Sequence, residues 1–277
     1  MYRGVSCAVV LPAYNVAAHL ERALTTIPSF VDLIVVVDDA SSDATAAVAR
    51  RVCEERTRST DTPSVLAQHE RNRGVGAAIS TGYDVAVQRG AAAVCVMAGD
   101  GQMDPADLPS LLDPLVEGRA DYVKGNRFAH AELWRAMPKT RIFGNVVLSL
   151  LTKVSSGYPR LFDSQCGYTA ISARALLALE GGFFSRYGYP NDLLARLRAA
   201  GARVVDVPVR PIYDGQSSGI RPWTILYPML FVLARSFGRR LWVQRIGPVF
   251  GRRAPRQLPP AQGSGEAEAA LLPARPR

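Results

Sequence analysis

Four short apolar runs, rich in valine and without polar alternation, recur within the first hundred residues. They are Ser6–Leu11, Leu33–Asp38, Ser64–Gln68 and Ala92–Met97. Alanine-rich segments that are amphipathic at helical spacing separate them. These segments are Val16–Thr26, Ala44–Glu55 and Gly76–Gln88. A strand that is apolar without alternation is buried on both faces, so the pattern predicts an α/β fold with a mostly parallel sheet and helices on both faces.

Local signals mark where two of the helices begin. Asp43, in the cluster Ser41–Asp43, is suited to cap the second helix. Pro105 follows Asp104 at the first turn of another helix, which we expect to end at Glu117. Beyond residue 125 the alternation becomes less regular. The 277 residues are enough for one large domain with a substantial core.

The charge of the chain is unevenly distributed. The formal net charge is +9 at pH 7, and arginines crowd near the C-terminus at Arg235, Arg239, Arg240, Arg245, Arg252, Arg253 and Arg256. Clustered arginine predicts an anionic partner, such as lipid headgroups, nucleic acid or a phosphorylated substrate. We expect no nucleic acid, because the tail after residue 250 lacks interleaved aromatic residues and the chain has no recognition motif.

The cysteines are scattered along the chain at Cys7, Cys53, Cys95 and Cys166, without a Cys-x-x-Cys pair. This arrangement favours reduced thiols in a cytosolic protein. The first residues lead almost directly into a predicted strand and do not resemble a signal peptide.

The fourth apolar run ends in the sequence Ala98-Gly99-Asp100-Gly101-Gln102. A carboxylate and an amide oxygen two residues apart suit a hard divalent cation. Ligands of an open α/β sheet collect at the carboxyl ends of its strands, where this motif is expected to lie. The other interpretation is that Asp100 only caps a turn.

Three more polar motifs follow apolar runs and are expected at the same edge. Pro12, Tyr14 and Asn15 follow the first run, where they form either a base-binding pocket or a turn with a helix cap. Asp38 and Asp39 end the second run. Adjacent carboxylates repel each other and need hydrogen-bond donors, such as a base N–H or a ribose hydroxyl. Asp38 is the stronger candidate for ligand contact, and Asp39 is suited to serve the following turn.

The third motif begins the helix after the third run. It contains Arg71, Asn72, Gly74 and Gly76. Glycines permit close backbone approach, a helix N-terminus favours an anion, and the arginine adds positive charge, so the motif predicts a phosphate site. His69 precedes it, and a solvated or helix-capping role is expected for that side chain, with contact to the nucleotide as the alternative.

The order and spacing of these motifs resemble those of the family 2 glycosyltransferases of GT-A fold. The resemblance is strongest to the polyprenyl-phosphate glycosyltransferases, such as dolichyl-phosphate mannose synthase, and it covers about residues 5 to 225. The matching motifs are Pro12–Asn15, Asp38–Ser41, Asn72–Gly76, Asp100–Gln102 and Gly125–Phe128. The resemblance implies a GT-A fold, with a Rossmann-like sheet, and a hexosyltransferase that uses a nucleotide sugar.

For the donor, the resemblance implies a GDP- or UDP-linked sugar. Its expected contacts are Pro12, Tyr14, Asn15, Asp38, Asp39, Arg71, Asn72, Gly74, Gly76 and Asp100. Asp100 and Gln102 would hold Mg²⁺ or Mn²⁺ on the diphosphate, with phosphate and water oxygens completing the shell. The chain departs from the family at Ala98, where an aspartate is common. That departure leaves open a non-catalytic protein that binds nucleotide sugars.

For the acceptor, the resemblance implies arginines that grip a phosphate, at Arg127 and Arg141. A guanidinium fork suits a pair of phosphate oxygens, although either arginine alone is also typical of a surface salt bridge. The other expected acceptor contacts are Asn145, Asp163 and Gln165. Cys166 is expected to be a small packed residue. Asp192 is either a helix cap or a carboxylate of the catalytic site.

The expected reaction displaces a nucleoside diphosphate at the sugar C1 with inversion. A phosphate monoester needs no base, since its second pKa is near 6, and this favours a polyprenyl phosphate as the acceptor. A glycan or small-molecule hydroxyl is the alternative acceptor, and Asp192 would then be the candidate base. The predicted catalytic residues are Asp100, Arg127, Arg141 and Asp192.

The chain is expected to contain a GT-A domain over residues 1–220, an amphipathic membrane-surface helix region over 221–250 and a disordered tail over 251–277. Leu230, Ala234, Phe237 and Leu241 share one helical face, and arginines lie opposite. Such a helix either lies in an anionic membrane surface or packs on the protein itself. The expected location is cytoplasmic, peripherally bound to the inner face of the membrane, and a homo-oligomer remains open.

Overall fold

A computed structural model describes residues 1–60, 62–130, 133, 139–179, 182–210, 212, 231–238 and 258, with the backbone alone described at 139–141. The strands are β1 (Cys7–Ala13), β2 (Leu33–Asp38), β3 (Ser64–Gln68), β4 (Ala93–Val96), β5 (Tyr122–Asn126), β6 (Thr169–Ser172) and β7 (Val204–Pro208). The helices are α1 (Ala17–Thr25), α2 (Thr45–Thr60), α3 (Val75–Gln88), α4 (Leu108–Val116), α6 (Lys139–Ser156), α7 (Ala173–Ala178) and α8 (Tyr189–Ala199). Two 3₁₀ turns, Pro105–Asp107 and Arg127–Ala129, precede α4 and follow β5.

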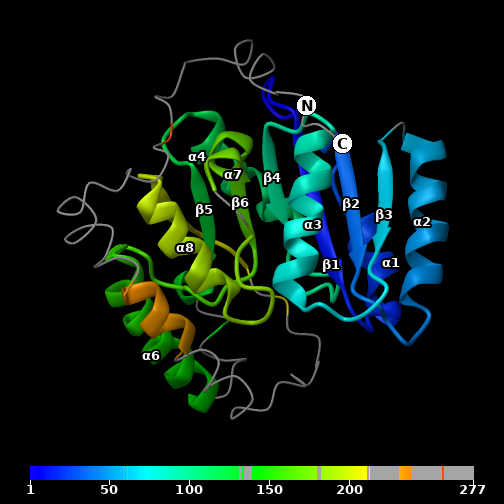
Figure 1. The fold of residues 1–277 in the computed structure, drawn as a ribbon. Helices are drawn as coiled ribbons and strands as arrows, with labels where there is room; N and C mark the ends of the chain where they lie inside the picture. The colour runs from blue at the N-terminus through cyan, green and yellow to red at the C-terminus, as the bar shows by residue number, and fades with distance from the viewer. Residues whose placement is uncertain are drawn as a thin grey trace.

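Within these residues the strands form one seven-stranded sheet in the order β3-β2-β1-β4-β6-β5-β7 (Figure 1). β1 pairs in parallel with β2 and β4, and β2 pairs in parallel with β3. β6 is antiparallel to β4 and β5, whereas β7 is parallel to β5. Only β6 therefore runs against the other described strands, which confirms the prediction of a mostly parallel sheet.

Both faces of the sheet are buried along β1, β2 and β4, as the unalternated apolar strands predict, whereas the edge strand β3 is only half-buried. Alternate residues of β1 divide between two cores: Val9 and Leu11 pack with α1, α2 and α4, and Val10 packs with α3 and α8. All five side chains from Leu33 to Val37 of β2 are less than 9% exposed. Helices thus cover both faces of the sheet (Figure 1), and this burial is the main stabilising contribution to the fold.

The predicted helix boundaries need small corrections. Asp43 accepts a hydrogen bond from the Thr45 backbone N–H at 2.9 Å, as expected of a capping residue. α2 continues to Thr60, beyond the expected end at Glu55. Its last turns are exposed and carry Arg–Glu pairs one turn apart, such as Arg51–Glu55 at 3.2 Å, which stabilise a solvated helix. The helix expected from Pro105 instead begins as a 3₁₀ turn before α4.

α6 belongs to an outer layer, because its main contact among the described elements is with α8. The Thr152 hydroxyl of α6 donates to Asn191 Oδ1 of α8 at 2.7 Å in a buried contact. A short helix over residues 231–238 lies beside α6 in Figure 1. Its Val232 packs closely on Gly188, where an added Cβ would lie 2.8 Å from Val232 Cγ2.

The expected membrane-surface region 221–250 and tail 251–277 lie largely outside the described residues. In the helix 231–238, Val232 and Leu233 are buried, whereas Phe231 and Phe237 are 61% and 40% exposed. One face of this segment therefore packs on the protein, and contact of the exposed face with a membrane stays a prediction. Among the described residues, none of the helices has the length and apolar character needed to span a bilayer.

We expect Gly82→Ala to destabilise the protein by about 1–3 kcal/mol, because the new methyl group would overpack the contact between α3 and β1. A Cβ at Gly82 would lie 2.2 Å from Val10 Cγ1. Gly144→Ala is the matched control, since a Cβ there meets no atom within 4 Å, and it should be neutral or stabilising by up to about 1 kcal/mol. Urea unfolding measures both, and equal stabilities would contradict the packing described here.

Candidate functional site

The strand directions bring the predicted motifs to one edge of the sheet. The carboxyl ends of β1, β2, β3 and β4 meet there because these strands are parallel. β5 and β7 also end at this edge. Because β6 runs in the opposite direction, it begins at this edge, and the loop that leads into it lies there. Loops from both halves of the chain therefore surround one candidate site.

The carboxylate of Asp39 organises the donor side of this edge. It is 2% exposed and accepts hydrogen bonds from the backbone N–H groups of Arg73 at 2.8 Å and Gly74 at 2.7 Å. Its Oδ1 also lies 2.7 Å from His69 Nδ1. Asp39 thus ties the end of β2 to the loop after β3, a larger structural role than serving its own turn.

His69 is buried, so the solvated or capping role expected for it is wrong. Its side chain is 5% exposed, and Nε2 lies 3.0 Å from the Thr81 hydroxyl on α3. The imidazole therefore bridges Asp39 and α3 beneath the loop. The sequence signal was the histidine just before the glycine-rich motif, but its partners lie in other elements.

The glycines of the third motif approach protein backbone. A Cβ at Gly74 would lie 2.6 Å from the Ser185 carbonyl oxygen, and one at Gly76 would lie 2.2 Å from the Phe184 carbonyl oxygen. Gly74 also has a φ of +94°, which favours glycine. Because Asp39 already accepts from the Arg73 and Gly74 amides, an internal carboxylate sits where a phosphate was expected. Contact of these glycines with a nucleotide stays a prediction.

The remaining donor-side residues lie on the rim. Tyr14 is 51% exposed, and Arg71 and Asn72 are also exposed. Asn15 accepts from the Ser42 backbone N–H at 2.8 Å through its side-chain oxygen, which ties the loop after β1 to the loop after β2.

Two more of the predicted donor residues are built into strands. Pro12 lies within β1, opposite Val37 of β2. Asp38 is buried, and its Oδ1 accepts from the Ser41 backbone N–H at 3.3 Å.

The predicted metal motif forms a tight turn after β4. Asp100 Oδ1 accepts from the Gln102 backbone N–H at 3.0 Å, and Gly101 has a φ of +72°. The Asp100 carboxylate and the Gln102 amide supply hard oxygen donors that suit Mg²⁺ or Mn²⁺. The described residues contain no group of three or more His, Cys, Asp or Glu side chains that could hold an ion. A cation here would therefore depend on diphosphate oxygens and water, which fits the donor set.

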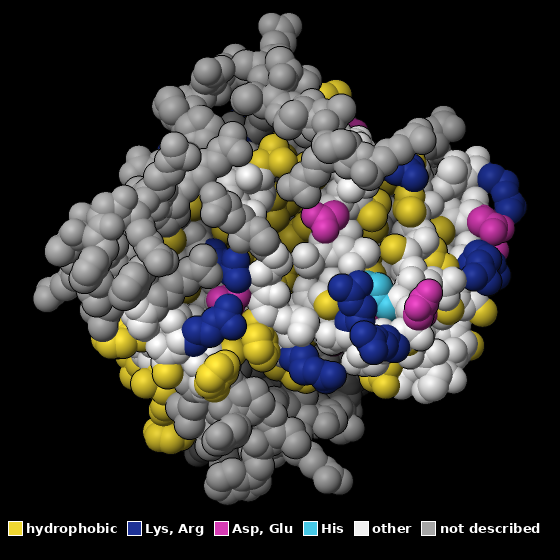
Figure 2. Space-filling view, in the orientation of Figure 1, with side chains coloured by type: hydrophobic (Ala, Val, Ile, Leu, Met, Phe, Trp, Pro, Cys, Tyr) yellow, Lys and Arg dark blue, Asp and Glu magenta, His cyan; other side chains and the backbone are white. Residues whose placement is uncertain are grey.

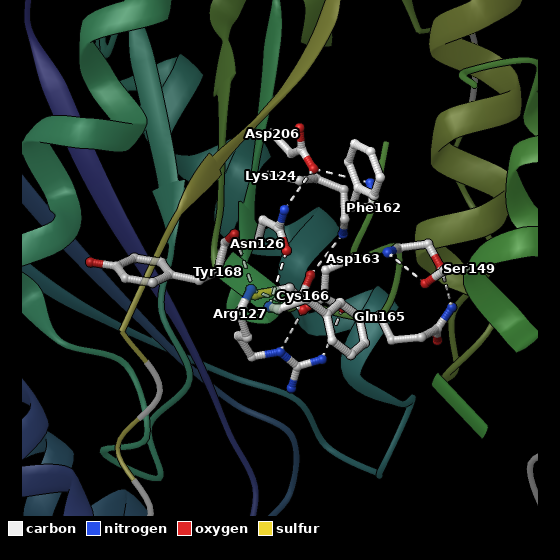
Figure 3. A network of polar contacts seen from close by, with 12 residues as sticks. Lys124, Asn126, Arg127, Ser149, Phe162, Asp163, Gln165, Cys166, Tyr168 and Asp206 are labelled. Atoms are coloured by element: carbon white, nitrogen blue, oxygen red, sulfur yellow. Dashed lines mark hydrogen bonds and ion pairs between the residues drawn. The ribbon is translucent and has the colours of Figure 1, made fainter. Parts of the chain in front are cut away.

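Arg127 forms a buried, bidentate ion pair with Asp163 (Figure 3). Arg127 Nε donates to Oδ2 at 2.7 Å and Nη2 donates to Oδ1 at 3.0 Å. The Asp163 side chain is fully buried and that of Arg127 is 18% exposed. Arg127 thus forms a salt bridge, as the alternative interpretation predicted, but a partly buried one, and its contact with a phosphate stays a prediction. Asp163, expected to contact the acceptor, instead directs both of its oxygens to the guanidinium.

The metal motif and Arg127 line one cavity of about 40 Å³. Gln102 and Arg127 contribute to its wall together with Gly167 and Arg210. The backbone of residue 212 reinforces the wall, since the Ile212 N–H donates to the Gln102 carbonyl at 3.1 Å. One residue of the predicted cation site, Gln102, and one of the predicted acceptor site, Arg127, therefore lie on the wall of the same small cavity.

Sequence reasoning missed two cations at this edge. Arg210 follows β7, and its backbone N–H donates to Asp107 Oδ2 at 2.6 Å. The valine-rich run Val204–Val209 was the sequence signal that could have identified Arg210. A polar residue directly after an apolar run is expected at the carboxyl edge of the sheet, and Asp38 was selected by this rule. Lys124 is 1% exposed inside β5, and burial lowers the pKa of its ammonium to about 8. A single lysine in an apolar run gives no comparable signal.

The other predicted acceptor residues lie on α6 and in the loop before β6. Arg141 belongs to α6, but its side chain is outside the described part of the chain, and Asn145 is half-buried on the same helix. Gln165 Nε2 donates to the Ser164 hydroxyl at 2.8 Å. Cys166 is buried as expected, and burial raises the pKa of its thiol.

Asp192 is neither exposed nor a helix cap. α8 begins after Gly188, and no side chain caps it. The Asp192 carboxylate is 3% exposed, pairs with Arg196 Nε at 3.0 Å and accepts from the Phe184 backbone N–H at 3.0 Å. Arg235 of the helix 231–238 lies 3.9 Å away. The helix-cap interpretation is therefore wrong, and Asp192 joins α8 to the loop before it.

Comparison with known proteins agrees with this geometry. The model of glycosyl transferase family 2 matches residues 8–177. The UDP-N-acetylglucosamine–dolichyl-phosphate N-acetylglucosaminyltransferase of Methanococcus voltae is 29% identical over 218 residues, which cover 76% of this chain and 86% of that protein. The undecaprenyl-phosphate mannosyltransferase of Micrococcus luteus is 30% identical over 219 residues, with the same coverages of 76% and 86%.

A solved structure is similar in fold. Glucosyl-3-phosphoglycerate synthase from Mycobacterium tuberculosis, in complex with Mn²⁺, UDP and glucosyl-3-phosphoglycerate, superposes with a TM-score of 0.61 at 20% identity. The match covers 85% of this chain and 81% of that chain. The predicted GT-A fold is thereby confirmed.

We expect Asp39→Asn to destabilise the protein by about 2–4 kcal/mol, because an amide cannot accept from Arg73, Gly74 and His69 as the carboxylate does. Asp38→Asn is the matched control, and it should cost less than half as much, since the Asp38 carboxylate receives one longer bond from Ser41. Urea unfolding at pH 7 measures both. Equal losses would contradict the organising role of Asp39.

Proposed function

Because the chain belongs to glycosyl transferase family 2, we propose that it transfers a sugar from a GDP- or UDP-linked donor to a polyprenyl phosphate. Two relatives with about 30% identity support this choice of acceptor, since their names specify dolichyl phosphate and undecaprenyl phosphate. Both relatives match across 86% of their own length, so the similarity extends over most of each protein.

The observation that carries the proposal is the shared cavity of Gln102 and Arg127. A cation held by Asp100 and Gln102 would sit on the donor diphosphate, and Arg127 would face the acceptor phosphate across the same space. Two anionic reactants would otherwise repel each other. The site supplies a separate positive group for each of them.

Asp100 and Gln102 would hold Mg²⁺ or Mn²⁺, which when bound neutralises the charge that grows on the departing diphosphate. An acceptor phosphate oxygen forms the new bond to the sugar C1 while the C1–O bond to the diphosphate breaks. The bonding pair leaves with the nucleoside diphosphate. A single displacement of this kind inverts the anomeric configuration.

The acceptor phosphate needs placement and no base. Its second pKa is near 6, so at neutral pH it is largely a dianion that is already nucleophilic. Asp163 fixes the Arg127 guanidinium by two bonds, which lowers the entropic cost of positioning the phosphate. Arg141 and Asn145 on α6 are the further proposed contacts. Asp192, the base candidate for a hydroxyl acceptor, has its carboxylate bound to Arg196 and the Phe184 amide.

The exposed face of α6 supports an anionic membrane surface as a partner. The polarity of its two faces is the reverse of that in a typical helix of a water-soluble domain, because the apolar side chains are exposed and the small polar ones are buried. Phe143, Leu150 and Val154 are 71%, 55% and 61% exposed, whereas Thr152 and Ser156 are fully buried. Hydrophobic side chains gather at the surface over α6 in Figure 2. An apolar helical face of this size marks a binding surface, and a lipid layer accepts such a face.

The position of α6 connects this apolar face with the acceptor site. Ser149 on the buried side of α6 lies 3.3 Å, oxygen to oxygen, from the hydroxyl of Ser164, the neighbour of Asp163. A helix resting on the membrane would thus hold the acceptor loop close to the headgroups, where the phosphate of a polyprenyl lipid lies. The net charge of +9 adds attraction to an anionic leaflet.

The function is tested by incubating the protein with a panel of GDP- and UDP-sugars, Mg²⁺ or Mn²⁺, and a short polyprenyl phosphate. We expect a lipid-linked sugar phosphate by mass analysis, no product in excess EDTA, and a rate at least about a hundredfold lower for Asp100→Ala. Asp113→Ala is the control, because it removes a carboxylate of α4 that pairs with Arg3. Transfer only to hydroxyl acceptors, or full activity in EDTA, would contradict the proposal.

We expect Leu150→Glu to weaken binding to anionic lipid vesicles at least about tenfold, because it places a charge on the face that enters the lipid. Leu177→Glu on α7 is the matched control, since Leu177 is also exposed, at 39%, and should leave vesicle binding unchanged. Co-sedimentation with vesicles measures both. If Leu150→Glu instead converts a dimer into monomers and leaves vesicle binding intact, the face is a protein interface and the proposal is wrong.

A further inference from the structure

Lys124 is a charged side chain in a place where the fold does not need one. It lies in the interior of β5, is 1% exposed, and donates from Nζ to the Cys166 carbonyl at 2.7 Å (Figure 3). Its β5 neighbours Tyr122 and Val123 are buried apolar residues. Burial of an ammonium disfavours the folded state, so a purely structural position would be better filled by an apolar residue.

The choice of lysine also stands out against the composition. Only three of the 33 lysine and arginine residues are lysines, at positions 124, 139 and 153. Arginine stays charged in any protein environment, whereas a buried lysine has a readily shifted pKa. A chain whose basic residues are mostly arginines thus has a titratable cation, Lys124, beneath the loop of residues 163–167.

The Cys166 carbonyl belongs to a compact loop, residues 163–167, that lies directly on β5. A Cβ at Gly125 would lie 3.1 Å from Cys166 Sγ, so the loop and the strand touch at this glycine. The Gly125 N–H donates to the Tyr168 carbonyl at 2.8 Å, just beyond the loop. Within the loop the Cys166 N–H donates to the Asp163 carbonyl at 3.4 Å. Lys124 therefore holds the same short loop that carries Asp163.

The hydrogen bond between Lys124 and the Cys166 carbonyl also affects the orientation of Arg127, because both residues bond to the same loop. Asp163 is bonded to the Arg127 guanidinium through both oxygens and also accepts from the Arg127 backbone N–H at 3.2 Å. A shift of the Cys166 carbonyl would move Asp163 and so reorient the fork of Arg127. Figure 3 shows Lys124, Cys166, Asp163 and Arg127 in one connected network.

We propose that Lys124 is a positioning residue of the acceptor site. In its protonated form, Lys124 holds the loop of residues 163–167 and thereby presents Arg127 to the acceptor phosphate. This inference rests on the proposed function. It assigns Lys124 no contact with the substrate. The ammonium acts through the Cys166 carbonyl and by adding positive charge behind the Asp163–Arg127 pair.

The surroundings of Lys124 give the expected pH dependence. Burial lowers its pKa to about 8, with the Asp163 carboxylate favouring the charged form and Arg127 opposing it. On β7, Asp206 lies opposite Lys124 in the sheet, and burial raises the pKa of that carboxyl while Lys153 on α6 lowers it. As the pH rises from 7 to 9, Lys124 loses its charge while an acceptor phosphate remains a dianion. Acceptor binding should weaken over this interval.

The test compares Lys124→Met with wild-type enzyme in steady-state kinetics from pH 7 to pH 9, using a short polyprenyl phosphate. Lys153→Met is the matched control, since Lys153 is a half-buried lysine on α6 next to Phe162 of the same region. At pH 7 we expect Lys124→Met to raise the acceptor KM about tenfold, with the donor KM within twofold of wild type. The wild-type acceptor KM should rise severalfold by pH 9, and that rise should be absent in the variant.

Thermal unfolding distinguishes positioning from simple structural support. Removal of a buried charge should leave the Tm of Lys124→Met unchanged or raise it, although acceptor binding is weakened. A lower Tm with kcat and both KM values impaired together would overturn the proposal, as would kinetics equal to wild type. A wild-type acceptor KM that stays flat from pH 7 to 9 would overturn it without any variant. Wild-type protein that makes no lipid-linked product would overturn the proposed function and this inference with it.

Discussion

The parallel alignment of β1 to β4 is the constraint on which the site depends. Every crossover between these strands returns through a helix, so each strand ends at the same edge of the sheet. Burial on both faces holds the strands in register, and the loops at their ends are free to carry polar residues. The single reversed strand β6 extends this edge, because it brings the loop before it, with Asp163, beside the loop after β5. Donor-side and acceptor-side residues then line one cavity.

Two buried carboxylates convert this edge into a defined site. Asp39 fixes the loop after β3 through the Arg73 and Gly74 amides, and Asp163 fixes the guanidinium of Arg127. Asp39 occupies the amides that were expected to bind a phosphate, whereas Asp163 fixes the orientation of the guanidinium through Nε and Nη2. A buried carboxylate left without such partners would be strongly destabilising, so the loops and the carboxylates stabilise each other. Preorganised loops of this kind suit a transferase, since little ordering remains to be done when the two anionic substrates arrive.

The sequence predicts more of the fold than of the site. Apolar runs without alternation correctly predict the strands β1 to β4 and the burial of β1, β2 and β4, because periodicity reports burial along an element, whereas β3 at the edge of the sheet is only half-buried. It does not report partners that are distant in sequence. His69 was expected to be solvated because its partner Asp39 is 30 residues away, and Asp163 was assigned to the acceptor although its partner Arg127 is 36 residues away. Lys124 gives no signal at all, since its partner is a backbone carbonyl 42 residues away.

α6 shows a second limit of prediction from the sequence, which concerns the face of a helix that packs on the protein. In the proposed function this helix also links the site to the lipid. A helical pattern predicts that two faces differ in polarity, but not which face packs on the protein. On α6 the small hydroxyl residues pack inward, where Thr152 bonds to Asn191, and the large apolar residues face outward. A hydroxyl face is a poor hydrophobic contact, so α6 is held to the domain by hydrogen bonds to α8 and to the acceptor loop. In the proposed function, an outward apolar face joined by hydrogen bonds to the loop of Asp163 would couple membrane contact to the geometry of Arg127. An acceptor whose phosphate lies at the lipid surface is the substrate that benefits from this coupling.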